Sequence, residues 1–248
     1  MDPVNQPPEL AALPPAEQID GPGGGVLLLC DHASNHVPAD ISLGVLPALL
    51  DLHIGYDIGA AALTRSLATR IRAPAVLGTV SRLVIDLHRE PHHDALVPPA
   101  SDGHVIPGNA AADRLGRIER FHMPYHAAIE QAVRDYRPAL VVAIHSFTPR
   151  LASGGPERPW QVGILYNQDS RAAHPAIAAL RGRGLVTGDN EPYSGRELNA
   201  TLNRHAEAHG IPSISVEVRN DLIGDDAGVA NWTAILAEVI GTVRTQLR

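Results

Sequence analysis

Two histidines follow apolar segments at points where a buried strand would end. The run Val26 to Cys30 leads directly into Asp31 and His32, and the run that begins at Leu140 leads into His145. A side chain at the carboxyl end of a strand is held rigidly, as a metal ligand or a base must be. We therefore predict that both histidines bind a metal. The alternatives are a surface-loop histidine for the first and a histidine bonded to a loop carbonyl for the second.

Glu217 lies within the otherwise apolar run Ile211 to Val218. A carboxylate on a buried strand must be paired, coordinated or protonated, because the burial of an isolated charge is very unfavourable. One interpretation is an ion pair with Arg219 or another arginine. The other, which we favour, is general acid–base catalysis by a carboxyl group whose pKa is tuned by burial and a nearby cation.

Arg82 and Arg89 bracket the segment Leu83 to Leu87, for which we predict a strand. A guanidinium group can bind a carboxylate through two hydrogen bonds, so the pair suits a substrate with an acid group. The alternative is an ion pair with Asp86. Asp57 precedes a helical pattern, where its carboxylate would either cap backbone N–H groups or bind the metal.

The other candidate motifs give weaker support for a functional role. His92, His93 and Asp94 lie in the long loop 90–109, which is rich in proline, and we interpret them as lid or surface residues. His36 is given a structural role. The chain has no HExxH, P-loop or GxSxG motif. The single cysteine, Cys30, belongs to an apolar run and is expected to be buried.

Composition excludes several classes of protein. The net charge of -7 and the lack of a basic run argue against a nucleic-acid binder. No apolar stretch approaches the ~20 residues that a bilayer span needs. The N-terminal segment has no signal-peptide pattern, so a cytoplasmic location is expected. The expected partner is a small-molecule carboxylate, with no nucleic acid and no membrane; the oligomeric state is left open.

The order of apolar patterns predicts a single α/β domain over residues 26–248, after a flexible arm over residues 1–25. Strands alternate with helices, which indicates a layered sandwich with a largely parallel sheet. We predict strands over 26–30, 76–79, 83–87, 140–147, 161–166, 185–191 and 213–218, and helices over 57–71, 113–136 with an interruption near Pro124, 174–183, within 195–209, and 227–246.

With these residues identified, the chain resembles the N-formylglutamate amidohydrolase family. The matching segments are LLLCDHASNHVP, HIGYDIGA, SRLVIDLHRE, VVAIHSF, EPYSG with LNRH, and SISVEVRNDL. The resemblance implies a three-layer α/β sandwich with a mixed, eight-stranded sheet, like that of zinc exopeptidases and phosphorylase/hydrolase-like proteins. It also implies a zinc ion, or another divalent metal, at the strand ends and a catalytic glutamate late in the chain.

The resemblance implies a set of site residues. The metal ligands would be His32, Asp57 and His145, with Asp57 preferred over Asn35 as the third. Glu217 would be the catalytic base, and Arg82 would assist at the oxyanion. The remaining matches imply substrate contacts from Arg89, His88, Ser146 of the His-Ser pair, Tyr193, and Arg196, which follows EPYSG.

Two departures from the family pattern bear on the substrate. The usual PHSG or PHAG turn is DHASN here, and the usual DLNR is DLHR with His88. The expected activity is metal-dependent hydrolysis of an N-acyl amino acid such as N-formylglutamate. The alternatives are a related carboxypeptidase or deacylase acting on another amide, and a non-catalytic module that binds carboxylates.

Overall fold

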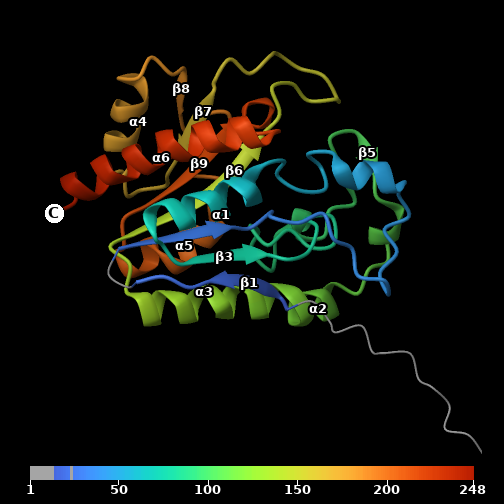
Figure 1. Cartoon of the computed structure of the whole chain (residues 1–248). Helices are drawn as coiled ribbons and strands as arrows, with labels where there is room; N and C mark the ends of the chain where they lie inside the picture. Colours follow the sequence, from blue (N-terminus) through green and yellow to red (C-terminus); the bar gives the residue numbers. More distant parts are fainter. Residues whose placement is uncertain (1–13, 23–24) are drawn as a thin grey trace, which may run out of the picture.

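A single twisted sheet forms the centre of the computed structural model, which describes residues 14–22 and 25–248 (Figure 1). Among these residues seven strands build the sheet in the order β1-β3-β2-β6-β9-β7-β8, and β4 with β5 forms a separate hairpin. In chain order the strands are β1 (Ala16–Ile19), β2 (Val26–Cys30), β3 (Ala75–Gly78), β4 (Ala100–Ser101), β5 (His104–Val105), β6 (Leu140–Phe147), β7 (Val162–Leu165), β8 (Thr187–Asp189) and β9 (Ser213–Arg219).

Most neighbouring strands run parallel. β2 pairs in parallel with β3 and β6, as do β6 with β9 and β7 with β8, whereas β1 with β3 and β7 with β9 are antiparallel. β2 and β6 are buried along their whole length, as expected of strands covered on both faces. The predicted mixed, largely parallel sheet is confirmed, with seven strands in the described residues where the resemblance implied eight.

Helices cover both faces of the sheet. α1 (Ala60–Ile71), α4 (Ala173–Arg181) and α6 (Asp226–Gln246) pack on one face, and α3 (Met123–Tyr136) and α5 (Ala200–His205) pack on the other. In Figure 1, α6 lies above the sheet and α3 below it. Alternate residues of β2 point to the two cores, with Leu28 in the first and Leu29 in the second. The sandwich therefore has the three layers expected.

The predicted helix over 113–136 is a continuous helical segment that is interrupted by a π-helical turn. α2 (Arg114–Arg117) continues through a π-helical turn, Ile118–His122, into α3, so the interruption lies just before Pro124. None of the helices in the described part of the chain is both long and apolar enough to span a bilayer.

Two predicted elements are corrected. The segment 83–87 is a buried turn and not a strand: the N–H of Val84 bonds to the Ser81 carbonyl and that of Asp86 to the Leu96 carbonyl. Its apolar residues are buried all the same, and a short apolar run does not distinguish a strand from a turn inside a core. The predicted flexible arm contains the edge strand β1, which pairs with β3. The arm's residues 1–13 and 23–24 lie outside the described residues.

Candidate active site

The polar residues predicted from the strand ends gather around one cavity of about 500 Å³. This cavity lies at the carboxyl ends of β2, β6 and β9, where open parallel sheets bind their ligands. Of the predicted site residues, those that line it are His32, Asp57, Arg82, His88, Arg89, His145, Ser146, Tyr193 and Glu217. Arg196 is exposed and is not among the lining residues.

Three ligand atoms converge at the centre of this cavity. His32 Nδ1 lies 3.3 Å and His145 Nδ1 lies 2.8 Å from the same oxygen, Asp57 Oδ2. The three side chains are almost fully buried, and one ligand atom from each falls within 4.8 Å of the others. Two imidazole nitrogens and one carboxylate oxygen form a donor set found in catalytic zinc sites, which keep a further position open. These residues therefore fit a divalent metal.

Backbone contacts hold Asp57 in this position. Its N–H bonds to the His32 carbonyl at 3.0 Å, and the N–H of Ser146 lies 3.3 Å from Asp57 Oδ2. Gly59 precedes α1, which has no side-chain cap, so the helix-capping interpretation of Asp57 is wrong. Asn35, the other candidate for the third ligand, donates to Asp51 instead.

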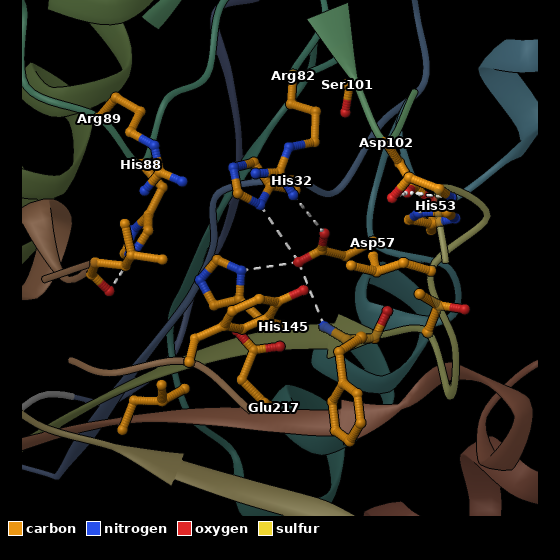
Figure 2. Close-up of a pocket in the computed structure, with 18 of the residues that line it drawn as sticks. His32, His53, Asp57, Arg82, His88, Arg89, Ser101, Asp102, His145 and Glu217 are labelled. Atoms are coloured by element: carbon orange, nitrogen blue, oxygen red, sulfur yellow. Dashed lines mark hydrogen bonds and ion pairs between the residues drawn. The ribbon is translucent and has the colours of Figure 1, made fainter. Parts of the chain in front are cut away.

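Each of the two histidines contacts a second carboxylate through its outer nitrogen. His32 Nε2 lies 2.7 Å from Asp86 Oδ1, and His145 Nε2 lies 3.1 Å from Asp31 Oδ2. Burial opposes the charged form of His145, but its hydrogen bonds to Asp31 and Asp57 hold its pKa well above the usual value. A carboxylate behind a ligand histidine fixes the tautomer and orients the ring. The pattern leaves both Nδ1 atoms directed at Asp57 (Figure 2).

Asp31, His88 and His145 form a second, overlapping His/Asp cluster. Here the carboxylate is already saturated with donors: Tyr125 Oη and Thr201 Oγ1 donate to Asp31 Oδ1, and both histidines contact Oδ2. Asp31 is fully buried and does not line the cavity. We therefore interpret it as a group that orients His145 and His88, and not as part of a second metal site.

Glu217 faces the cavity from β9, where its Cα pairs with that of His145 on β6. Its Oε2 is buried and has no hydrogen-bond partner among the described residues. Burial raises the pKa of its carboxyl group to about 7. Arg219 pairs with Asp221 at 2.8 Å, and no ion pair in the described residues joins Glu217 to another arginine, so the predicted alternative of an ion pair between Glu217 and an arginine is wrong.

The two arginines differ in how fully they are engaged. Arg82 donates to Asp57 Oδ1 at 3.3 Å and to Asp86 Oδ2 at 2.8 Å, so the expected ion pair with Asp86 is present. Arg89 lies farther from Asp86, with 4.0 Å between Nε and Oδ2. Its buried Nε has no hydrogen-bond partner in the described part of the chain. Arg89 is therefore the arginine of the cavity that is most available to a ligand.

The remaining predicted residues contribute to the walls. Ser146 Oγ donates to the Ile58 carbonyl at 2.8 Å, and Tyr193 Oη accepts from Arg158 at 3.1 Å. His88 lies between Asp31 and the Leu198 carbonyl. The exposed residues His92 and His93 lie outside the cavity, as expected of surface or lid residues.

Sequence reasoning gave no role at the site to His53 and Asp102, and treated Asp86 only as an ion-pair partner. A carboxylate inside an apolar segment was a usable signal for Asp86, because the same argument identified Glu217. His53 and Asp102 lie in loops, where no periodicity points to them.

The comparisons with known proteins agree with this geometry. The model of the N-formylglutamate amidohydrolase family matches residues 24–224. The chain belongs to this family. It is 32% identical to the gene product Atu2144 of Agrobacterium tumefaciens, over 93% of this chain and 94% of that one, with a TM-score of 0.88.

Two structures with lower sequence identity share the fold of this protein. The N-formylglutamate amidohydrolase of Ralstonia eutropha JMP134 is 20% identical over 94% of this chain and 97% of that one, with a TM-score of 0.68. A bacteriophage poly-gamma-glutamate hydrolase is 9% identical over 93% and 88% of the two chains, with a TM-score of 0.50. The search of curated proteins gave no match. Family membership makes the chain an amidohydrolase-type hydrolase.

Proposed function

We propose that this protein hydrolyses the amide bond of an N-acyl amino acid in a metal-dependent reaction, with N-formylglutamate as the substrate that the family name suggests. The observation that carries the proposal is the convergence of His32 Nδ1, Asp57 Oδ2 and His145 Nδ1. Beside them, on the next strand, lies Glu217, whose buried Oε2 has no hydrogen-bond partner among the described residues. Zinc is the metal that this donor set favours.

The three converging residues would hold the ion. A divalent metal at this position supplies Lewis-acid chemistry, which polarises a carbonyl group and acidifies water. His32 and His145 keep their ligand nitrogens in place because Asp86 and Asp31 bind the opposite side of each ring.

Glu217 would act as the proton carrier. Its carboxylate takes a proton from the attacking water as the new carbon–oxygen bond forms. It then delivers that proton to the amide nitrogen as the carbon–nitrogen bond breaks. The products are a free carboxylate and an amine. A pKa raised to about 7 by burial suits a group that both accepts and returns a proton near neutral pH.

The arginines would act on the two charged parts of the substrate. Arg89, whose buried Nε has no hydrogen-bond partner in residues 14–22 and 25–248, would bind the substrate carboxylate. Arg82 lies against Asp57 and so is close enough to the metal position to support the developing oxyanion. Family membership favours an enzyme over the non-catalytic binding module.

Elemental analysis after reconstitution with zinc, combined with amine release from N-formylglutamate, tests the proposal. We expect about one bound ion per chain, and a loss of roughly two orders of magnitude or more in kcat for Glu217→Gln with the metal retained. Glu238→Gln, at an exposed position on α6, is the matched control and should behave as the parent protein does. A protein that binds no metal, or a Glu217→Gln variant with unchanged turnover, would refute it.

A further inference from the structure

The two ends of the cavity differ in charge. In Figure 2, Arg89 and His88 lie on one side of Asp57 and His145, and His53 and Asp102 lie on the other. All of these residues line the same cavity. A substrate whose scissile bond lies at the metal position would therefore extend one arm toward each end.

The arginine end has one guanidinium group available for a carboxylate. Arg82 already bonds to Asp57 and Asp86, whereas the buried Nε of Arg89 has only a 4.0 Å ion-pair contact with Asp86 and no hydrogen-bond partner in the part of the chain that the structure describes. A single carboxylate can therefore be bound there through charge-assisted hydrogen bonds.

The opposite end is closed by Asp102. This residue lies in the turn between β4 and β5, and its carboxylate accepts hydrogen bonds from the N–H groups of Ala152 and Ser153 at 2.8 and 2.9 Å. His53 Nε2 lies 2.9 Å from the same carboxylate. We refer to Asp102, His53, Ala152 and Ser153 as the Asp102 clasp.

The Asp102 clasp does not favour an acid group on the acyl arm of the substrate. Burial opposes ionisation of Asp102, but its bonds to Ser153 and Ala152 outweigh this effect and lower its pKa to about 2, so it is ionised. Burial lowers the pKa of His53. The nearby cation, Arg158, bonds to the Thr148 carbonyl and Tyr193 Oη and lies over the Phe147 and Tyr193 rings. Arg158 is not among the lining residues.

Apolar side chains complete the cavity wall. Phe147 ends β6 just after the metal-site residues, Leu151 adjoins the clasp, and Leu165 ends β7. A volume of about 500 Å³ falls in the range that encloses drug-sized ligands. A formyl group, with its single carbon, would leave much of this wall without contact.

We propose that Arg89 binds the carboxylate of the amino-acid arm, and that the preferred acyl group is uncharged, larger than formyl, and lies against Leu151 and Phe147 beneath the Asp102 clasp. The inference rests on the proposed function and narrows it. It predicts that an N-acyl amino acid with a larger uncharged acyl group is hydrolysed better than its N-formyl counterpart, and better than a counterpart whose acyl group ends in a carboxylate.

Three matched substrates test both parts of the proposal with the zinc-loaded protein: N-formyl-L-glutamate, N-butanoyl-L-glutamate and N-succinyl-L-glutamate. Each kcat/KM is divided by the rate constant of uncatalysed alkaline hydrolysis, which removes the greater intrinsic reactivity of formamides. We expect the butanoyl compound to exceed the formyl compound by about tenfold or more, as one or two well-packed methylenes provide. The succinyl compound, which places a carboxylate near Asp102, should fall about tenfold below the butanoyl compound.

A variant in the proposed acyl wall locates the preference. Leu151→Ala should reduce the butanoyl-to-formyl ratio about tenfold, whereas Leu115→Ala, at an exposed leucine on α2 outside the cavity, should leave it unchanged. Circular dichroism serves to check that both variants are folded. If Leu151→Ala leaves the butanoyl-to-formyl ratio unchanged, the acyl group does not lie against Leu151 and the proposal is wrong.

The outcomes separate this inference from the proposed function. If N-formyl-L-glutamate is hydrolysed best, the function stands and the inference is wrong. If the zinc-loaded protein hydrolyses none of the three, the proposed function fails and the inference fails with it.

Discussion

Asp86 and His32 form one of the closest side-chain contacts of the site, with 2.7 Å between Oδ1 and Nε2. The contact lies on the side of the imidazole ring opposite to Asp57, so the carboxylate orients the ring and directs Nδ1 toward the metal position. Asp31 does the same for His145 at 3.1 Å. The two predicted ligand histidines thus depend on two carboxylates to which the sequence analysis assigned no orienting role.

Removing the carboxylate of Asp86 should weaken metal binding. In Asp86→Asn the side chain keeps its shape but loses the charge that supports His32, and we expect zinc affinity to fall about 10–100-fold. Competition with a chromophoric chelator measures this value in folded protein. Asp94→Asn, at an exposed position outside the cavity, serves as the control. Equal zinc affinities in the two variants would contradict the orienting role.

Arg89 should account for recognition of the substrate carboxylate. A hydrogen bond to a charged group contributes about 1.5–3 kcal/mol, so Arg89→Ala should lower kcat/KM by about 10–150-fold. The loss should be much smaller for the corresponding carboxamide substrate, which has no charge to bind. A loss of the same size on both substrates would indicate a structural defect and not carboxylate binding.

Arg196 provides the comparison, because sequence resemblance implied a substrate contact for it and the structure leaves it exposed outside the cavity. Arg196→Ala should therefore change kcat/KM little. If this variant loses as much activity as Arg89→Ala, the segment that follows Tyr193 must close over bound substrate.

Stability should fall in mild acid because of a buried histidine pair behind the site. His126 Nδ1 lies 2.8 Å from His205 Nε2, and His126 Nε2 donates to the Leu87 carbonyl at 3.0 Å. Burial lowers the pKa of His126 to about 2 and that of His205 to about 4. The unfolded chain, with histidine pKa values near 6.5, then binds more protons than the folded protein at pH 4–6.

The free energy of unfolding should therefore decrease as pH falls below about 6.5, by at most about 1.4 kcal/mol per pH unit for each histidine. Urea unfolding at several pH values measures the slope. His205→Gln should make it shallower by up to that amount, whereas His174→Gln, at an exposed position, should not. The same slope in all three proteins would mean that other groups cause the acid sensitivity.

The sequence was sufficient to predict that a side chain lies at the cavity where that side chain belongs to a strand of the sheet or comes within two residues of the strand's end. His32, His145 and Glu217 all meet this condition, because apolar runs identify buried strands and parallel strands bring their carboxyl ends together. Asp57 was ambiguous between two roles. Only the structure excluded the capping role, because α1 begins after Gly59 and has no side-chain cap.

The rest depended on tertiary contacts that no local pattern encodes. The segment 83–87 has the composition of a strand, yet it folds as a buried turn because its neighbours, and not a ladder, supply its backbone partners. Asp102 meets His53 and the segment 151–153 only after three separate loops have been placed by the sheet. The spacing of residues in the sequence does not predict such contacts between distant loops.

The pairing of His145 with Glu217 across β6 and β9 has a consequence for how this protein can change. A one-residue insertion in either strand would turn its side chains to the opposite face and separate the two groups. Asp102 and Leu151, in contrast, lie on surface loops that tolerate length changes. The residues proposed for the reaction and those proposed for substrate selectivity thus lie in different parts of the chain. Libraries of loop variants around Asp102 and Leu151 therefore offer a route to new substrates with the strands left intact.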